Sequence, residues 1–300
     1  MKFNYSPIIL IVAVLAFSAC SKKSVSHQEQ ARMLIRCDDI GLNHAVNMAA
    51  DRMVQSGLPF SASVMFVAPW VQEAVQILKG HANVSIGVHL TLNSEWQGYR
   101  WGPITGTGSA GSLVDSNGYF WPTTQQFLDH NPDPDEVESE LTAQIKRALQ
   151  SGLQIDYLDY HMGSAVAIPQ LRKIVEELAK KYHLGISRYL GEQTSNGIYS
   201  VPPASKVDSL VAIVNSLSKK ETALMVFHIG LDTPEMEALK DQNPDGLPNV
   251  AANRNAELNA LLSYEFANTL EQNQVRLINY KTLINEVGLK KMSRPTTINY

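Results

Sequence analysis

The sequence has only two cysteines among its 300 residues, Cys20 and Cys37, and no long run of charges of one sign. Two cysteines cannot build the disulfide framework that stabilises small secreted domains, so a hydrophobic core must hold the chain together. Lysine and arginine total 25 and aspartate and glutamate total 29, a formal net charge of −4. This balance argues against nucleic acid as the principal ligand, because phosphate binding depends on a basic surface. With 44% hydrophobic residues, the composition is that of a globular protein.

An apolar run covers residues 8–17. It is about ten residues long, shorter than the roughly twenty that a transmembrane helix needs, and is typical of a signal peptide, which we expect over residues 1–19. Residues 17–20, Phe-Ser-Ala-Cys, resemble a bacterial lipobox, in which the cysteine becomes the lipidated first residue. We therefore expect Cys20 to be lipidated and residues 20–32 to form a tether to a membrane. The protein would then lie in the bacterial cell envelope, on the periplasmic face or at the cell surface, with simple secretion as the alternative.

Beyond the tether the chain alternates between two hydrophobic periods. Seven short apolar or β-branched runs, typical of buried strands, cover residues 33–37, 60–67, 84–92, 155–160, 184–190, 223–229 and 275–280. Between most of them, apolar side chains recur every three or four positions, most clearly over residues 135–150 and 169–182, which predicts amphipathic helices. Regular alternation of strand and helix predicts parallel strands joined by right-handed crossovers.

We therefore predict an α/β fold in one domain over residues 33–288, followed by a C-terminal tail over residues 289–300. The architecture that fits best is a distorted TIM-like (β/α) barrel of about seven parallel strands, because a chain of this length can close such strands around one core. An open doubly wound sheet is the alternative.

Ionisable side chains gather where the predicted strands end. Asp38 and Asp39 follow the first strand, and three of the eight histidines, His89, His161 and His228, lie at the ends of the third, fourth and sixth. The carboxyl ends of parallel strands form one face of the fold, so these side chains can converge there. Taken singly, an Asp pair more often caps a helix and a histidine more often belongs to the core. Together they predict a metal centre, since one carboxylate and two imidazoles commonly bind zinc and similar divalent ions.

Such a metal centre predicts metal-assisted hydrolysis, and two of the five side chains have natural roles in it. Asp38, next to Asp39, could take a proton from the attacking water, and His228, on another strand, could donate one to the leaving group.

The motifs that carry these residues also occur together in a known family. Residues 37–42 read Cys-Asp-Asp-Ile-Gly-Leu, residues 87–90 Gly-Val-His-Leu, residues 159–161 Asp-Tyr-His and residues 228–230 His-Ile-Gly, with Asn47, Arg254 and Glu257 as further matching positions. In this order they resemble the motifs of the YdjC-like carbohydrate deacetylases, the family that includes chito-oligosaccharide deacetylase. The resemblance extends from about residue 33 to residue 280.

This resemblance implies a (β/α) barrel, one divalent metal ion, Zn²⁺ or Mg²⁺, and removal of N-acetyl groups from an amino-sugar-containing oligosaccharide or glycan. Carried over position by position, it makes Asp39, His89 and His161 the metal ligands. It makes Asp38 the base and His228 the acid.

Three positions depart from the family pattern. They are Gly163 in place of a second histidine, Ile229 in place of the proline of a His-Pro-Gly motif, and Ile40 in place of phenylalanine. The departures leave the ligand set intact and bear instead on the sugar preference.

Five further side chains are candidates for substrate binding. Trp96 and Trp101 lie in an aromatic-rich segment, where exposed rings would suit stacking on sugars, although the segment could instead pack on the barrel as a lid. Arg188 ends the fifth predicted strand and could reach the site or form a structural ion pair. Arg254 and Glu257 are three apart on a predicted helix, which alone would favour a local surface pair. The family resemblance places them at the site instead.

Two other functions remain open from the residues alone. Glycoside hydrolysis could use Asp38 and a distant carboxylate such as Asp159, without a metal. The aromatic segment and the predicted anchor would also suit a non-catalytic, glycan-binding lipoprotein. The protein could also form a homodimer.

Overall fold

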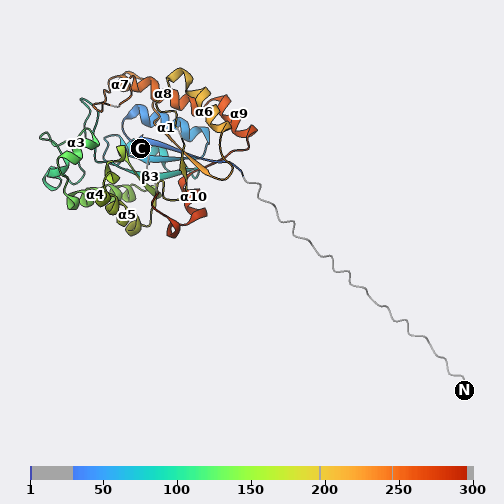
Figure 1. The fold of residues 1–300 in the computed structure, drawn as a ribbon, viewed down its shortest axis with the longest axis horizontal. Coiled ribbons are helices and arrows are strands. Elements are labelled where there is room, and N and C mark those ends of the chain that lie inside the picture. Colours follow the sequence, from blue (N-terminus) through green and yellow to red (C-terminus); the bar gives the residue numbers. More distant parts are fainter. Residues whose placement is uncertain (2–29, 196, 245, 296–300) are drawn as a thin grey trace.

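The computed structural model describes residue 1 and residues 30–295, except residues 196 and 245 (Figure 1). The predicted signal peptide, the lipidation site Cys20 and most of the tether lie outside the described residues, as does the end of the predicted tail. Among the helices that the structure describes, none combines the length and the apolar character needed to cross a membrane.

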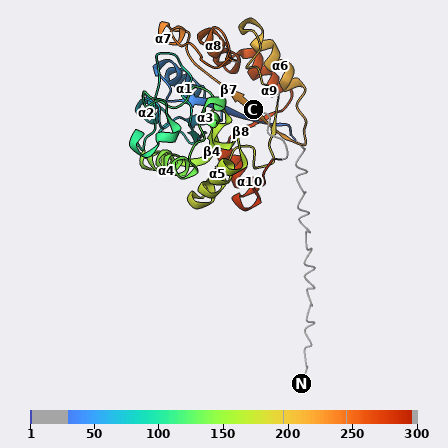
Figure 2. The ribbon, with the colours of Figure 1, turned by 60° about the vertical axis from the view of Figure 1, so that its left-hand side comes forward.

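The described strands form one parallel sheet with helices packed around it (Figures 1 and 2). The strands are β1 (Arg32–Ile40), β2 (Phe60–Val64), β3 (Val84–Leu90), β4 (Ile155–Tyr160), β5 (Gly185–Ile186), β6 (Gln193–Thr194), β7 (Thr222–Phe227) and β8 (Arg276–Ile278). Their order is β5-β4-β3-β2-β1-β7-β6, and β8 pairs with the first residues of β1. The sheet is curled and has open ends at β5 and β6. This confirms the predicted distorted TIM-like barrel.

Ten α-helices lie within the described residues. They are α1 (His44–Ser56), α2 (Val71–Leu78), α3 (Thr124–Asp129), α4 (Pro134–Gln150), α5 (Pro169–Tyr182), α6 (Lys206–Asn215), α7 (Pro234–Glu237), α8 (Val250–Leu261), α9 (Tyr264–Gln272) and α10 (Tyr280–Val287). Short 3₁₀ helices, η1 (Thr107–Ser109), η2 (Gly111–Leu113), η3 (His161–Val166), η4 (Pro203–Ser205) and η5 (Leu289–Lys291), complete the described structure. The helices α4 and α5 match the two amphipathic patterns within one residue.

Local sequence explains where α4 begins and which face it buries. Asp133 caps the helix by accepting a hydrogen bond from the backbone N–H of Asp135, and Pro134 occupies the first turn, where its missing N–H costs nothing. Val137, Leu141 and other apolar residues at three- and four-residue spacing are buried against the sheet.

Gly87 of the second motif has a packing reason to be glycine. A Cβ at this position would lie 2.3 Å from Cζ of Tyr157, whose ring is fully buried on the neighbouring strand β4. The Tyr157 hydroxyl is in turn 2.8 Å from the Ser63 hydroxyl. The glycine therefore admits a large ring beside β3, two residues before His89.

Two long segments follow the carboxyl ends of β3 and β7, and we call this end of the sheet the mouth. The aromatic segment, residues 93–133, is folded, since Trp96, Trp101 and other aromatic residues in it are buried. The second segment, residues 231–253, contains α7 and the start of α8. Backbone hydrogen bonds from Gln97 to Lys240 and from Gln242 to Glu95, each 2.8 Å long, join the two segments.

Candidate metal centre

The chain leaves regular strand geometry where β1 ends. The β1–β2 register shifts between Cys37 and Ile40, and Asp39 has a left-handed backbone conformation with φ +62°. Gly41 follows with φ +97°, and its N–H donates to Oδ1 of Asn47 at 2.9 Å. A non-glycine residue in this region costs of order 1–3 kcal/mol and persists only where its surroundings enforce it. The first motif thus folds as a bulge and turn that Asn47 secures.

The carboxylate of Asp39 meets two imidazoles at the mouth. Oδ1 of Asp39 is 3.4 Å from Nε2 of His89 and 3.2 Å from Nδ1 of His161. The two nitrogens are 3.3 Å apart, and the three residues are at most 5% exposed. Such a triangle has the spacing of three ligands that each lie ~2.1 Å from one ion. The structure therefore brings together the three side chains that the sequence predicted to converge.

The far nitrogen of each ring faces a second carboxylate. Nδ1 of His89 is 3.0 Å from Oδ1 of Asp159, and Nε2 of His161 is 2.9 Å from Oε2 of Glu95. A carboxylate at one ring nitrogen favours a proton there and leaves the lone pair of the other nitrogen available. Both available nitrogens then face Asp39.

The two carboxylate oxygens of Asp39 have different surroundings, and their arrangement fits a divalent ion. Its Oδ2 accepts a hydrogen bond from Nη2 of Arg254 at 2.6 Å, whereas Oδ1 is a buried acceptor with no hydrogen-bond partner among the described residues. Burial alone would raise the pKa of Asp39, but the Arg254 guanidinium and the two imidazoles hold it well below its usual range. An ionised, orphaned oxygen between two imidazole nitrogens suits a cation, so the set fits a divalent metal.

The surrounding carboxylates make the cluster attractive to positive charge. Burial would lower the pKa of His89, but Asp159 and Asp38 raise it to about 9. The pKa of His161 is raised well above its usual value by Glu95 and Asp39, again against burial. The centre therefore favours cations, whether protons or a metal ion.

Asp38 lies beside this triangle and is held by Arg36. Nε and Nη2 of the guanidinium donate to Oδ1 and Oδ2 of Asp38 at 2.7 and 2.6 Å, a bidentate pair. Burial alone would raise the pKa of Asp38, but Arg36 and His89 outweigh it and lower the pKa. The carboxylate is therefore ionised at neutral pH, and each oxygen keeps lone-pair capacity for a further proton.

Asp159 is unsuited to the acid or base role that glycoside hydrolysis would give it. Its side chain has no exposed surface. Oδ2 accepts a hydrogen bond from the Ser63 hydroxyl at 2.6 Å and lies 3.1 Å from Nε of Arg36, while Oδ1 faces His89. Oδ2 is thus held by two partners and Oδ1 has a charge contact with His89, so the residue supports its neighbours.

His228 follows β7 and is half-buried at the mouth. Its backbone N–H donates to Oε2 of Glu257 at 2.7 Å, and its ring centroid is 5.1 Å from that of Tyr199. Oε1 of Glu257 pairs with Nζ of Lys206 at 3.2 Å, and Nζ also donates to the carbonyls of Ile198 and Tyr199. Lys206 and Glu257 therefore hold the strand end that carries His228 and the backbone of Tyr199, whose ring lies beside His228.

We expect Lys206→Met to destabilise the protein by about 3–5 kcal/mol, because it leaves the buried Glu257 carboxylate without its charge partner. The side chain of Lys206 has 0% exposure and that of Glu257 has 1%. Urea unfolding measures the change, and Lys220→Met, at an exposed lysine, is the matched control and should shift stability by at most about 0.5 kcal/mol. Equal unfolding midpoints for the two variants would show that the buried pair contributes nothing.

Some of the predicted substrate-binding residues lie at the candidate metal centre, and others do not. Trp96 and Trp101 are 3% and 4% exposed, and the Trp96 ring lies 5.6 Å from Cζ of Arg254. Arg254 and Glu257 lie on α8 and are buried against Asp39 and His228. Nε of Arg188 donates to Thr194 of β6 at 3.1 Å. Arg254 and Glu257 thus reach the centre, and the substrate-binding role of all five residues stays a prediction.

Sequence reasoning missed Arg36, Glu95, Lys206 and Tyr199. Arg36 had a local signal, because residues two apart on a strand point to the same face, and Asp38 is two residues on. Glu95 and Lys206 contact partners 66 and 51 residues away, so no local pattern reveals them.

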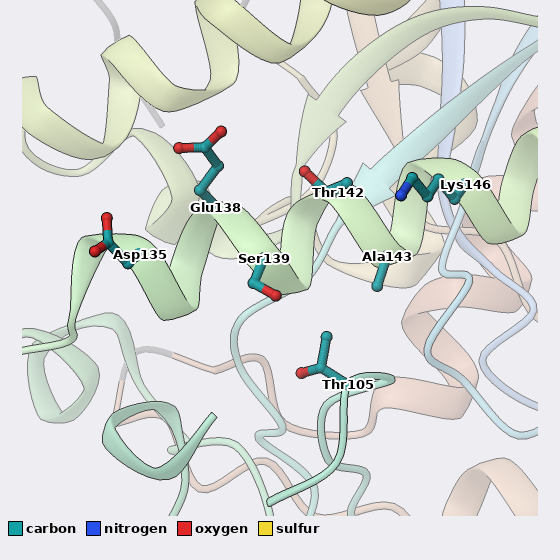
Figure 3. A pocket seen from close by; sticks show the side chains of 7 residues that line it. All are labelled: Thr105, Asp135, Glu138, Ser139, Thr142, Ala143 and Lys146. Carbon is teal, nitrogen blue, oxygen red and sulfur yellow. The ribbon is translucent and has the colours of Figure 1, made fainter. Parts of the chain in front are cut away.

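A separate polar groove lies between Thr105 and α4 (Figure 3). It encloses about 420 Å³, and its lining residues on the helix are Asp135, Glu138, Ser139, Thr142, Ala143 and Lys146. None of them belongs to the Asp and His cluster, so the groove is distinct from the candidate centre.

Comparison with known proteins identifies the family. A model of the family described as YdjC-like protein matches residues 32–272. The chain belongs to this family. It is similar to a carbohydrate deacetylase of Thermoanaerobacter pseudethanolicus, at 26% identity over 84% of this chain and 98% of that protein. A carbohydrate deacetylase of Thermus thermophilus is 37% identical over 51% of each chain.

The fold of this YdjC-like protein also has a solved counterpart. A crystal structure of a proposed cellobiose-phosphate cleavage protein from Enterococcus faecalis V583 is similar to it with a TM-score of 0.69 and 23% identity. The match covers 85% of this chain and 99% of that one. It supports the distorted barrel that the strand order shows.

Proposed function

We propose that the protein is a metal-dependent hydrolase that removes N-acetyl groups from an amino-sugar-containing oligosaccharide or glycan. The observation that carries the proposal is the buried triangle of Asp39, His89 and His161 at the mouth of the barrel. The similar proteins of Thermoanaerobacter pseudethanolicus and Thermus thermophilus are carbohydrate deacetylases, which supports the reaction class.

In this proposal the three side chains of the triangle hold one divalent ion, Zn²⁺ or Mg²⁺. Such an ion, when bound, polarises a carbonyl and lowers the pKa of bound water. Arg254 keeps Asp39 ionised and oriented through its 2.6 Å hydrogen bond. Asp159 and Glu95 hold the far nitrogens of the two imidazoles, so the chain supplies a fixed set of ligands.

Asp38 acts as the general base. It is ionised because Arg36 lowers its pKa, and it neighbours the triangle in sequence and in space. It accepts a proton from the water that attacks the acetyl carbon, a role that contributes ~10²–10⁴-fold to the rate of typical enzymes.

His228 acts as the proton donor to the leaving nitrogen. Burial lowers its pKa despite the nearby Asp39 and Asp38 carboxylates, so the resting imidazole is mainly neutral near pH 7. During turnover it therefore takes up a proton from solvent and passes it to the departing nitrogen, and Asp38 returns to solvent the proton that it accepts from the attacking water. The amide C–N bond breaks, the water oxygen remains on the acetyl group as acetate, and the sugar leaves as a free amine.

A lipid-anchored protein of the bacterial cell envelope is a further part of the proposal. Its support is the apolar run and the Phe-Ser-Ala-Cys sequence that ends at Cys20. Mass spectrometry of the mature N-terminus tests it, and an unmodified Cys20 would contradict it. A homodimer stays a prediction, for light scattering to test.

A screen of N-acetylated oligosaccharides for released acetate tests the proposed reaction. Activity should be lost with a chelator and return when a divalent metal is added back. New reducing ends that form despite the chelator would favour glycoside hydrolysis instead. Binding without any product, unaffected by loss of the site histidines, would favour a glycan-binding protein.

A further inference from the structure

Glu95 is a buried carboxylate that belongs to none of the sequence motifs. It lies at the start of the aromatic segment, five residues after β3 ends, and is 4% exposed. Its Oε2 is 2.9 Å from Nε2 of His161. Its carbonyl oxygen accepts the backbone N–H of Gln242 in the second mouth segment at 2.8 Å.

The geometry separates Glu95 from the ion-facing side of the cluster. His161 turns Nδ1 toward Asp39 and His89, at 3.2 and 3.3 Å, and turns Nε2 toward Glu95. The two nitrogens of an imidazole point away from each other across the ring. Glu95 therefore contacts the side of His161 that the proposed ion does not, and any effect it has on the ion passes through His161.

We propose that Glu95 is a positioning residue that fixes the ring orientation and the tautomer of His161 for metal binding. The inference rests on the proposed metal-dependent function. A carboxylate on the far nitrogen keeps a proton there, leaves the lone pair on Nδ1 and makes the ring a better ligand. Without it, the ring can flip or carry its proton on the wrong nitrogen.

Trp96, the residue after Glu95, is linked to a second proposed ligand, Asp39. Trp96 packs against Arg254, with the ring centroid 5.6 Å from Cζ, and Arg254 holds Oδ2 of Asp39. Of these two consecutive residues, Glu95 therefore contacts His161 directly, and Trp96 contacts Arg254, which binds Asp39. The hydrogen bond from Gln242 to Glu95 ties the second mouth segment to the same point, so both segments are linked to the centre.

The experiment compares the metal affinity of Glu95→Ala and Glu95→Gln with that of the full protein, using calorimetric titration with Zn²⁺ and competition with a chelator. Loss of such a partner typically weakens metal binding ~10–100-fold, which we expect for Glu95→Ala. Glu95→Gln keeps a hydrogen-bond acceptor without the charge. Its Zn²⁺ affinity should lie between that of the full protein and that of Glu95→Ala. Acetate release by Glu95→Ala should recover when Zn²⁺ is raised to saturation, which a misfolded site would not do.

Glu140→Gln is the matched control. Glu140 is also fully buried and holds the aromatic segment, through the backbone N–H groups of Ile104 and Thr105 at 3.1 and 3.0 Å, but it contacts none of the three proposed ligands. Its variant should bind Zn²⁺ as tightly as the unaltered protein. An equal loss of affinity in Glu140→Gln would overturn the proposal, because it would show a general loosening of the segment.

Unchanged Zn²⁺ affinity in Glu95→Ala would also overturn it. If Glu95→Ala does not fold, Glu95→Gln decides, and a change of less than about twofold in its dissociation constant contradicts the proposal. Absence of Zn²⁺ binding by the unaltered protein would instead count against the proposed function, so the two failures are distinguishable.

Discussion

His161→Ala is expected to abolish both metal binding and acetate release. The substitution removes one of the three proposed ligands, which lie together in a buried cluster. Asp39→Ala should have the same effect, with an added loss of stability because Arg254 loses the carboxylate it binds. Metal analysis of the purified variants and an acetate assay provide the two measurements.

His183→Ala is the control for this test, since His183 is exposed at the end of α5. It should retain metal and activity. Full activity in a His161→Ala or Asp39→Ala protein that contains no metal would refute the metal-dependent mechanism.

Asp38→Asn should retain the metal and lose turnover by ~10²–10⁴-fold, the usual contribution of a general base. Asparagine has nearly the same shape but no negative charge with which to accept the proton. Arg36 would still contact Asp159 and Ser187, at 3.1 and 2.7 Å, so the local structure should persist. Steady-state kinetics together with metal content separate the two effects.

Asp156→Asn makes the same chemical change at the opposite end of the sheet, where Asp156 accepts a hydrogen bond from Ser85 at 2.8 Å. Turnover should be unaffected. If Asp38→Asn also turns over at the normal rate, another group is the base.

The fold could be predicted because most strands carry their own signal. Each of the seven apolar runs overlaps an observed strand, and parallel pairing follows from the helices between them. The strand β6 was missed because it has two polar, exposed residues, Gln193 and Thr194, and pairs only at the sheet edge with β7. Backbone pairing formed it, and no hydrophobic period marks that kind of strand.

The sequence could predict the site residues that lie at the ends of strands. Asp39, His89 and His161 occupy such ends, so topology alone brings them together. The groups that orient them come from elsewhere. Glu95 lies in a long folded segment and Arg254 on a helix that follows another, and their approach depends on how buried rings such as Trp96 pack. No periodic pattern in the sequence marks this kind of packing.

A crystal structure of the protein soaked with Zn²⁺, with its anomalous scattering measured, tests the shared ion most directly. We expect one strong peak ~2.0–2.2 Å from Oδ1 of Asp39, Nε2 of His89 and Nδ1 of His161. A protein that releases acetate while the peak lies elsewhere, or while no ion joins these three atoms, would contradict it.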